Sequence, residues 1–320
     1  MNIPDIHKKF NTRNRCILYL ETLKWNKKPV CPFCDSEKVY KRMLSIKYHC
    51  NSCNKDFTVL HDTIFEESKL PLSKWFVIIG LMLNAKQGIS AKEIQRNVGT
   101  TYKTAWYSAM RVRCAMIDHC NIELENVVEM DETYVGGKPR YKYSKKDNEP
   151  NLSKLTSKRG RGTSKVPVVG IVERKNKIVL KVVDRLTSKN LVGMLKEFVN
   201  TDTSIVVTDE FKSYKAFDEI VQHYTVNHSK KEYVKGMMHT NTIEGFWSIV
   251  KNSIKGNYKA ISKKYLPFYL VQAQYNYNHR NYSANLFEKF LKQALETDKP
   301  MIGYKPVKNV NKIVYKTCKK

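Results

Sequence analysis

The chain has 320 residues, with 57 Lys and Arg against 30 Asp and Glu, and so a formal net charge of +27. That length is sufficient for about two or three domains with substantial cores, without support from disulfides. A basic excess spread along the whole chain favours a polyanionic partner over a generally basic protein that binds no polyanion, and no apolar run reaches the roughly 18 residues that a membrane span requires.

The N-terminal residues 1–10 carry charged side chains and no apolar signal core. Half of the eight cysteines form two close pairs, and the others are scattered: Cys16, Cys114, Cys120 and Cys318. This use of cysteine is typical of a reducing compartment with one metal site. We therefore expect a cytoplasmic, DNA-associated protein with no membrane partner.

The first 62 residues predict a small metal-stabilised module. Two C-x-x-C turns, Cys31 to Cys34 and Cys50 to Cys53, are separated by the fifteen residues 35–49. Such spacing is typical of a zinc ribbon, in which four thiolates surround one structural Zn²⁺. Disulfides and a redox motif are the alternatives, but a redox motif needs one such pair rather than two. We predict Zn²⁺ binding by Cys31, Cys34, Cys50 and Cys53.

Residues 63–122 predict a helical, DNA-binding region. One helical pattern runs over 73–83, and a second runs over 90–116 with Gly99 at its middle. Two short helices joined at a glycine are typical of a helix-turn-helix, although a plain structural helix pair has the same pattern. In the first case, the DNA-facing side chains are Thr101, Tyr102, Lys103 and Tyr107, with Arg111 and Arg113 near phosphates.

From residue 123 onward, strands alternate with helices. Apolar runs predict strands at 126–135, 168–172, 178–183 and 204–208, and helical patterns occur at 188–199, 240–254 and 266–280. A further helix and strand are expected between 209 and 240. Residues 138–165 hold ten basic and two acidic side chains and predict a basic loop. We expect one α/β domain over 123–290, followed by a basic tail over 291–320.

Three acids lie where metal-dependent phosphodiester chemistry would need them. Asp131 interrupts an apolar strand, Asp209 ends a short buried strand, and Glu244 lies in the first turn of an amphipathic helix. Two-metal sites take their oxygen ligands from several elements, and Mg²⁺ or Mn²⁺ prefers carboxylates. An acid at a helix start is also favoured by the helix dipole, so Glu244 alone does not establish a site.

Three segments resemble the catalytic motifs of the IS1595 (ISXO2-like) family of insertion-sequence transposases: residues 128–138, 207–209 and 239–248. The cysteine pairs, residues 68–75 and the basic loop match the family in the same order. The resemblance implies a multidomain α/β chain: a zinc ribbon and helix-turn-helix, then a ribonuclease-H-like mixed sheet with flanking helices.

The resemblance also implies roles for individual residues. Asp131, Asp209 and Glu244 become the catalytic triad that holds Mg²⁺ or Mn²⁺, and Lys251, seven residues after the third acid, becomes a DNA contact. Asn241 and His239 are substitutes for the third ligand, and Glu232 is a rival acid.

The implied function is a DNA transposase that cleaves insertion-sequence ends and joins them to target DNA. Its partners would be duplex terminal inverted repeats, target DNA and a second copy of the chain, in a homodimer or higher oligomer. Two alternatives stay open. One is a DNA-binding regulator derived from a transposase, and the other is a metal-dependent nuclease without strand transfer.

Overall fold

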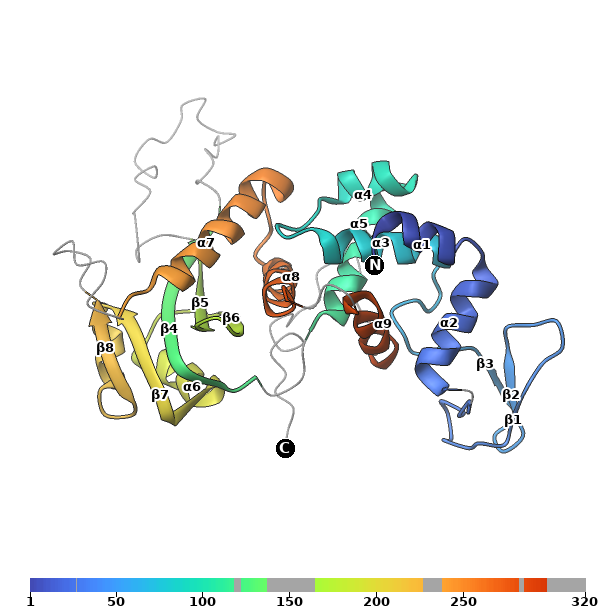
Figure 1. The fold of residues 1–320 in the computed structure, drawn as a ribbon, viewed down its shortest axis with the longest axis horizontal. Coiled ribbons are helices and arrows are strands. Elements are labelled where there is room, and N and C mark those ends of the chain that lie inside the picture. The colour runs from blue at the N-terminus through green and yellow to red at the C-terminus, as the bar shows by residue number, and fades with distance from the viewer. Residues whose placement is uncertain (27, 118–121, 137–164, 227–237, 282–284, 298–320) are drawn as a thin grey trace, which may run out of the picture. The chain divides into compact units, whose positions relative to one another are not determined.

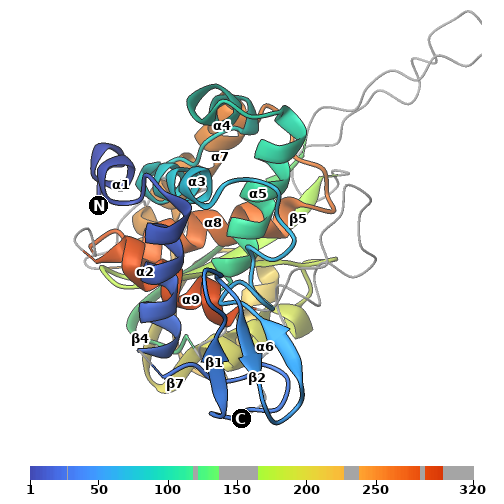
Figure 2. The ribbon, with the colours of Figure 1, turned by 90° about the vertical axis from the view of Figure 1, so that its right-hand side faces the viewer.

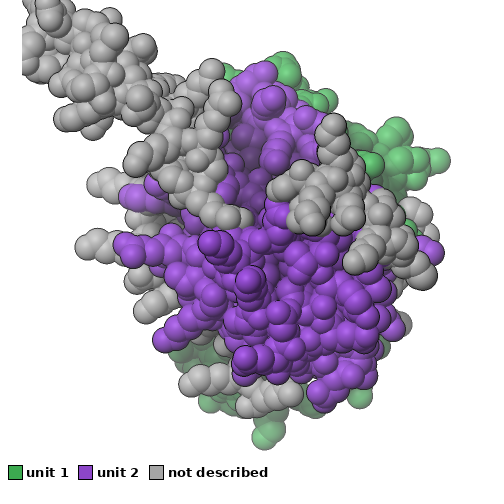
Figure 3. Space-filling view, turned by 90° about the vertical axis from the view of Figure 1, so that its left-hand side faces the viewer, with its two compact units in different colours: residues 1–119, 268–316 green, residues 120–267, 317–320 purple. Residues whose placement is uncertain are grey.

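The structure is a computed structural model that describes residues 1–26, 28–117, 122–136, 165–226, 238–281 and 285–297. The chain divides into two compact units, residues 1–119 with 268–316 and residues 120–267 with 317–320 (Figure 3). Almost all of the basic loop predicted at 138–165, and most of the tail predicted from 291, lie outside the described residues. None of the described helices is long and apolar enough to cross a membrane.

The first unit begins with two helices that the sequence patterns did not predict. Helix α1 spans Ile3–Lys9 and helix α2 spans Arg13–Trp25; each starts at a side-chain cap, Asn2 and Thr12 respectively. Helix α2 buries Cys16, Ile17 and Leu20, but its apolar residues do not gather in one clear stripe. The helical period is therefore weak in the sequence, and capping is the stronger signal.

Helix α3, Leu72–Asn84, lies at the centre of this unit. Its side chains are apolar on almost every face, and nine of its residues are buried, as expected for a helix surrounded by protein. It contacts α1, α2, α4 (Ala91–Val98), α5 (Tyr102–Ala115) and α9 (Leu286–Glu296), and Figure 2 shows these helices together. Helix α9 was not predicted; it runs past residue 291, where the basic tail was expected to begin.

The helical pattern over 90–116 becomes two helices, α4 and α5, joined by a tight turn. Ser90 and Thr101 cap their first turns, accepting hydrogen bonds from the backbone N–H of Glu93 and Thr104. Gly99 ends α4 with a φ of 61°, a conformation that costs glycine little. The predicted break at Gly99 is confirmed.

Three short strands form an antiparallel sheet in the order β1-β2-β3. They span Val39–Lys41, Tyr48–Cys50 and Lys55–Phe57. Buried Tyr48 and Phe57 pair across the sheet and pack with Trp25 and the cysteines in a small core. A core of this size needs additional support to stay folded, which a metal would supply.

The second unit is built on a five-stranded sheet in the order β6-β5-β4-β7-β8 (Figure 1). The three strands β4, β5 and β6 are antiparallel, whereas β7 and β8 run parallel to β4. In chain order the strands span Leu124–Val135, Val166–Glu173, Ile178–Val182, Val199–Asp209 and Gln222–Val226. This order and these directions give the mixed, ribonuclease-H-like sheet that was predicted.

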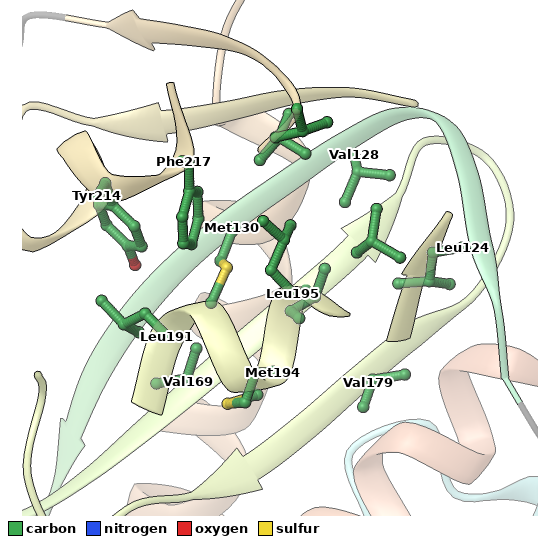
Figure 4. Packing of buried hydrophobic residues seen from close by; sticks show 14 of the residues in the cluster. Leu124, Val128, Met130, Val169, Val179, Leu191, Met194, Leu195, Tyr214 and Phe217 are labelled. Atoms are coloured by element: carbon green, nitrogen blue, oxygen red, sulfur yellow. The ribbon is translucent and has the colours of Figure 1, made fainter. Parts of the chain in front are cut away.

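Side chains of the central strand β4 alternate between the two faces of the sheet. Val128 and Met130 face a core closed by α6 (Ser188–Phe198) and the 3₁₀ helix η3 (Lys212–Phe217) (Figure 4). Glu129 and Asp131 face the other way, toward α7. Polar groups therefore occupy the face of β4 that α7 covers.

Helix α7 spans Asn241–Ser253 and packs on β4 and β5. A π-helical turn, Ile254–Tyr258, follows it, and helix α8 spans Leu266–Asn278. Phe246 and Trp247 are each 2% exposed, so both are core residues of this unit rather than exposed platforms for stacking on bases.

Candidate active site

The four paired cysteines come together in the first unit. All four Sγ atoms lie within 4.8 Å of one another, and the Cys31–Cys53 and Cys34–Cys50 pairs are each 3.6 Å apart. The two turns share one geometry: Asp35 N–H donates to the Cys31 carbonyl and Asn54 N–H donates to the Cys50 carbonyl. Asp35 and Asn54 both adopt positive φ, which their residue types tolerate well. The cluster is that of a structural Zn²⁺ site.

We expect one Zn²⁺ per chain at this cluster, and we expect Cys50→Ser to unfold residues 31–57 while leaving the second unit folded. Cys50 is fully buried at the end of β2, so its loss removes a metal ligand from a core that is too small to fold alone. Metal analysis by mass spectrometry and hydrogen exchange of both units measure the two effects. A metal-free protein with a protected β1-β2-β3 sheet would contradict this expectation.

The two aspartates predicted for the catalytic triad are brought together by the sheet register. Strand β4 pairs in parallel with β7, with Glu129 opposite Val207, so Asp131 and Asp209 lie two residues further along neighbouring strands. Carboxylate oxygens of Asp131, Glu132 and Asp209 all lie within 4.8 Å of one another. The juxtaposition predicted for Asp131 and Asp209 is therefore present.

Glu132 joins this group, although the sequence patterns gave it no role. The buried hydroxyl of Tyr214, on η3, donates a hydrogen bond to Glu132 Oε2 at 2.9 Å and holds that carboxylate. Burial raises the pKa of Tyr214, and the nearby Glu132, Asp131 and Asp209 raise it further, so this hydroxyl keeps its proton. The only sequence signal was an acid directly after Asp131.

Glu244 lies beside this group on the first turn of α7. It is exposed, it accepts a hydrogen bond from the Thr240 hydroxyl at 2.8 Å, and it is not one of the three mutually close carboxylates. Its charge still reaches Asp131. Burial raises the pKa of Asp131 to about 7, with further increases from Glu132, Asp209 and Glu244 in that order. A partly buried carboxylate crowded by three acids is poised to bind a cation.

The alternatives for the third ligand occupy different places. His239 Nδ1 lies 3.4 Å from Glu129 Oε1, directed at that carboxylate. Asn241 is the exposed first residue of α7. Glu232 lies outside the described residues. Lys251 is exposed on the last turn of α7, seven residues after Glu244.

The predicted DNA-facing residues of the helix pair fall into two groups. Thr101, Tyr102 and Lys103 are exposed at the start of α5, and Tyr107 is half-buried with the Arg111 guanidinium over its ring. The N-terminal turn of α5 thus presents three of the residues named from the sequence to solvent.

Arg111 and Arg113 are not on that surface. They are 4% and 2% exposed. Arg111 donates to the backbone carbonyls of Ile64 and Glu66, and Arg113 donates to the Gln272 side chain. We therefore correct the predicted phosphate contacts: both guanidinium groups are buried and hold distant segments of the first unit together.

Comparisons with known proteins agree with these features. Residues 12–56 match the transposase zinc-ribbon domain, and residues 123–278 match the ISXO2-like transposase domain. An uncharacterized protein in transposable element ISH50 of Halobacterium salinarum is 28% identical over 300 residues, which cover 91% of this chain and 97% of that protein. An uncharacterized transposase-like protein of Haemophilus influenzae is 28% identical over 123 residues, which cover 38% of this chain and 96% of that protein.

Among solved structures, the Mos1 strand transfer complex is 11% identical and matches with a TM-score of 0.28; the match covers 74% of this chain and 82% of that one. A pre-cleavage Mos1 transpososome matches with a TM-score of 0.24 at the same identity, covering 70% and 79% of the two chains.

Proposed function

We propose that this chain, which belongs to the IS1595 (ISXO2-like) family of transposases, cleaves DNA at the ends of an insertion sequence and joins those ends to target DNA. The observation that carries the proposal is the convergence of Asp131, Glu132 and Asp209 on the parallel strands β4 and β7, with Glu244 beside them. The acids come from separate segments of the chain, and only the fold brings them together.

This donor set fits hard divalent cations. Carboxylate oxygens are the ligands that Mg²⁺ and Mn²⁺ prefer, and the set contains no thiolate or imidazole that would favour a softer metal. Asp131, Glu132 and Asp209, with Glu244 beside them, would hold these ions. Bound ions would activate the attacking water or 3′-hydroxyl and stabilise the leaving oxygen.

The chain's own groups orient these ligands. Trp247 Nε1 donates to Asp131 Oδ2 at 3.1 Å, and the Phe211 N–H donates to Asp209 Oδ1 at 3.0 Å. Each bond holds its carboxylate in a fixed orientation within the acid group. Lys251, on the same helix as Glu244, supplies a positive charge for a DNA phosphate near the acids.

A regulator without catalysis and a nuclease without strand transfer remain the alternatives. Intact acids at all three positions predicted for the triad argue against a regulator, because a regulator has no use for a partly buried group of mutually repelling carboxylates. The nuclease shares the acids and differs only in its products.

The test is a cleavage and joining assay with duplexes that carry the inverted repeats flanking the gene. With Mg²⁺ or Mn²⁺, we expect nicking at the repeat ends and covalent joining of the new 3′ ends to a second duplex. Cleavage without joining would identify a nuclease. Specific binding without either product would identify a regulator.

We propose that DNA is bound by the exposed start of α5, with Thr101, Tyr102 and Lys103 in contact with the duplex. Tyr107 completes that surface. The two-domain DNA-binding region over 1–62 and 63–122, the catalytic domain over 123–290, the tail over 291–320 and an active homodimer or higher oligomer are parts of the same proposal.

We expect duplex binding to weaken by about 10³-fold or more between roughly 50 and 200 mM salt, because many phosphate contacts release counterions. Lys103→Ala is expected to lower the slope of log K against log salt by about one. The control is Lys292→Ala on α9, a lysine that pairs with Glu288 and should leave the slope unchanged. Fluorescence anisotropy over a salt series measures both variants, and a nearly flat salt dependence would show that the +27 charge serves another purpose.

A further inference from the structure

One buried glutamate of the second unit has no part in the acid group described above. Glu129 is 0% exposed in the middle of β4, two residues before Asp131 and on the same face of the strand. A lone buried carboxylate is costly, so its partners decide what it does.

The partners of Glu129 come from the start of α7. The backbone N–H groups of Thr242 and Ile243 donate to its Oε2 at 2.9 and 3.0 Å, and the Thr242 hydroxyl donates to Oε1 at 2.8 Å. These are N–H groups of the first helical turn, which have no acceptor within the helix. A carboxylate at this position satisfies them and interacts favourably with the positive end of the helix.

Arg174 completes the arrangement from the turn after β5. Its Nε donates to Glu129 Oε1 at 2.6 Å, and its Nη2 donates to the carbonyl of His239, just before α7. The arginine therefore neutralises Glu129 and also fixes the backbone that leads into the helix. Three separate segments meet at one carboxylate.

A second contact that holds α7 on the sheet lies one turn further along the helix. Gly170 of β5 pairs with Asp131 of β4, and a Cβ built at Gly170 would lie 2.7 Å from Trp247 Cζ2 and 2.9 Å from Ile243 Cδ1. The absent side chain lets α7 approach the sheet closely enough for Trp247 to reach Asp131. Glu244 lies between these two contacts on α7, one residue after Ile243 and three residues before Trp247.

We infer that Glu129 is a positioning residue: with Arg174 it fixes the first turn of α7 on β4, and this places Glu244 beside Asp131. The inference rests on the proposed function for its catalytic consequence, but not for its structural one. Buried ion pairs contribute little net stability compared with apolar packing. The charged arrangement instead fixes the orientation of α7 on the sheet, because its donors converge on one carboxylate in one geometry.

The test compares Glu129→Gln with Glu173→Gln. Glu173 is a second buried glutamate of the same unit, whose carboxylate accepts hydrogen bonds from Glu125 N–H, Asn126 and Asn176 and from no residue of α7. We expect Glu129→Gln to speed hydrogen exchange at the amides of Thr242 and Ile243, while Glu173→Gln leaves them protected. Thr242→Val removes only the hydroxyl donor and should speed the same exchange by a smaller factor. This variant replaces Glu129→Gln in the test if Glu129→Gln does not fold.

The catalytic arm uses a double-mutant cycle. Glu129→Gln is expected to lower cleavage by about 10- to 100-fold, as loss of a residue that orients a metal ligand commonly does. In a Glu244→Gln background it should cause almost no further loss, because it acts through Glu244. Additive losses, unchanged cleavage in Glu129→Gln, or unchanged exchange at the start of α7 would each overturn the inference. If the parent protein cleaves no DNA at all, the proposed function fails, while the exchange result still decides whether Glu129 fixes the helix.

Discussion

Asp131→Asn and Asp209→Asn are each expected to lower DNA cleavage and joining by on the order of 10³-fold or more while leaving end binding intact. Asparagine keeps the size of the side chain and removes the negative charge that a divalent cation needs. Asp131 lies within β4 and Asp209 at the end of β7, both in the second unit, whereas the exposed start of α5 belongs to the first unit. Both variants should therefore lose cleavage and joining while they retain DNA binding.

The assay is strand transfer of a labelled terminal-repeat duplex in Mg²⁺ or Mn²⁺, run beside a gel shift on the same DNA. Asp202→Asn, at an exposed aspartate of β7, is the matched control and should retain activity. The activities of Glu244→Gln and Glu132→Gln in the same assay show which acid completes the proposed metal site. Full activity in Glu244→Gln would move that role to Glu132, His239, Asn241 or Glu232. Full activity in Asp131→Asn or Asp209→Asn would contradict the mechanism.

Asp131 is also expected to make the Mg²⁺-free second unit less stable as pH rises. Its pKa is about 7 in the folded chain, against 3.8 for an ordinary aspartate. Between these values the folded state holds a proton that the unfolded state has released, so the free energy of unfolding falls as pH rises from about 4 to about 7 and then levels off. A shift of this size corresponds to at most about 4 kcal/mol.

Asp131→Asn removes this dependence and should raise the free energy of unfolding above pH 7, by up to about 4 kcal/mol, with little change near pH 4. The measurement is hydrogen exchange of the β4 and β7 amides at several pH values, with Mg²⁺ and Mn²⁺ omitted and zinc left in place. Asp202→Asn should follow the parent protein. If the free energy of unfolding measured at β4 of the parent protein does not change between pH 5 and pH 8, the pKa of Asp131 is not raised in the folded chain.

Local patterns predicted much of the fold. The cysteine turns, the strand around Asp131, the strand that ends at Asp209 and the break at Gly99 all follow from short-range spacing. Each depends on a period or a turn that a few neighbouring residues define. Helices α1, α2 and α9 were missed. The apolar residues of α2 form no clear stripe, and its burial is decided by contacts with α3 and α9.

The errors at the candidate site have a common cause. Arg111 and Arg113 have the spacing of surface arginines, but their acceptors, the carbonyls of Ile64 and Glu66 and the side chain of Gln272, are remote in sequence. The roles of Glu129 and Glu132 likewise depend on partners that only the tertiary fold supplies. Sequence spacing identifies which residues can do the chemistry, whereas long-range contacts decide which of them are free to do it.

The parallel pairing of β4 with β7 also determines when, during synthesis of the chain, the three acids can come together. Val207 of β7, which pairs with Glu129 of β4, is synthesised only after β5, β6 and α6. Glu244 is synthesised later still. Closing such a long loop is a late and slow event in folding. A chain still emerging from the ribosome, with residue 131 already outside but residue 209 not yet made, therefore holds only part of the proposed metal site. Under the proposed function, DNA cleavage therefore becomes possible only after synthesis has passed residue 244.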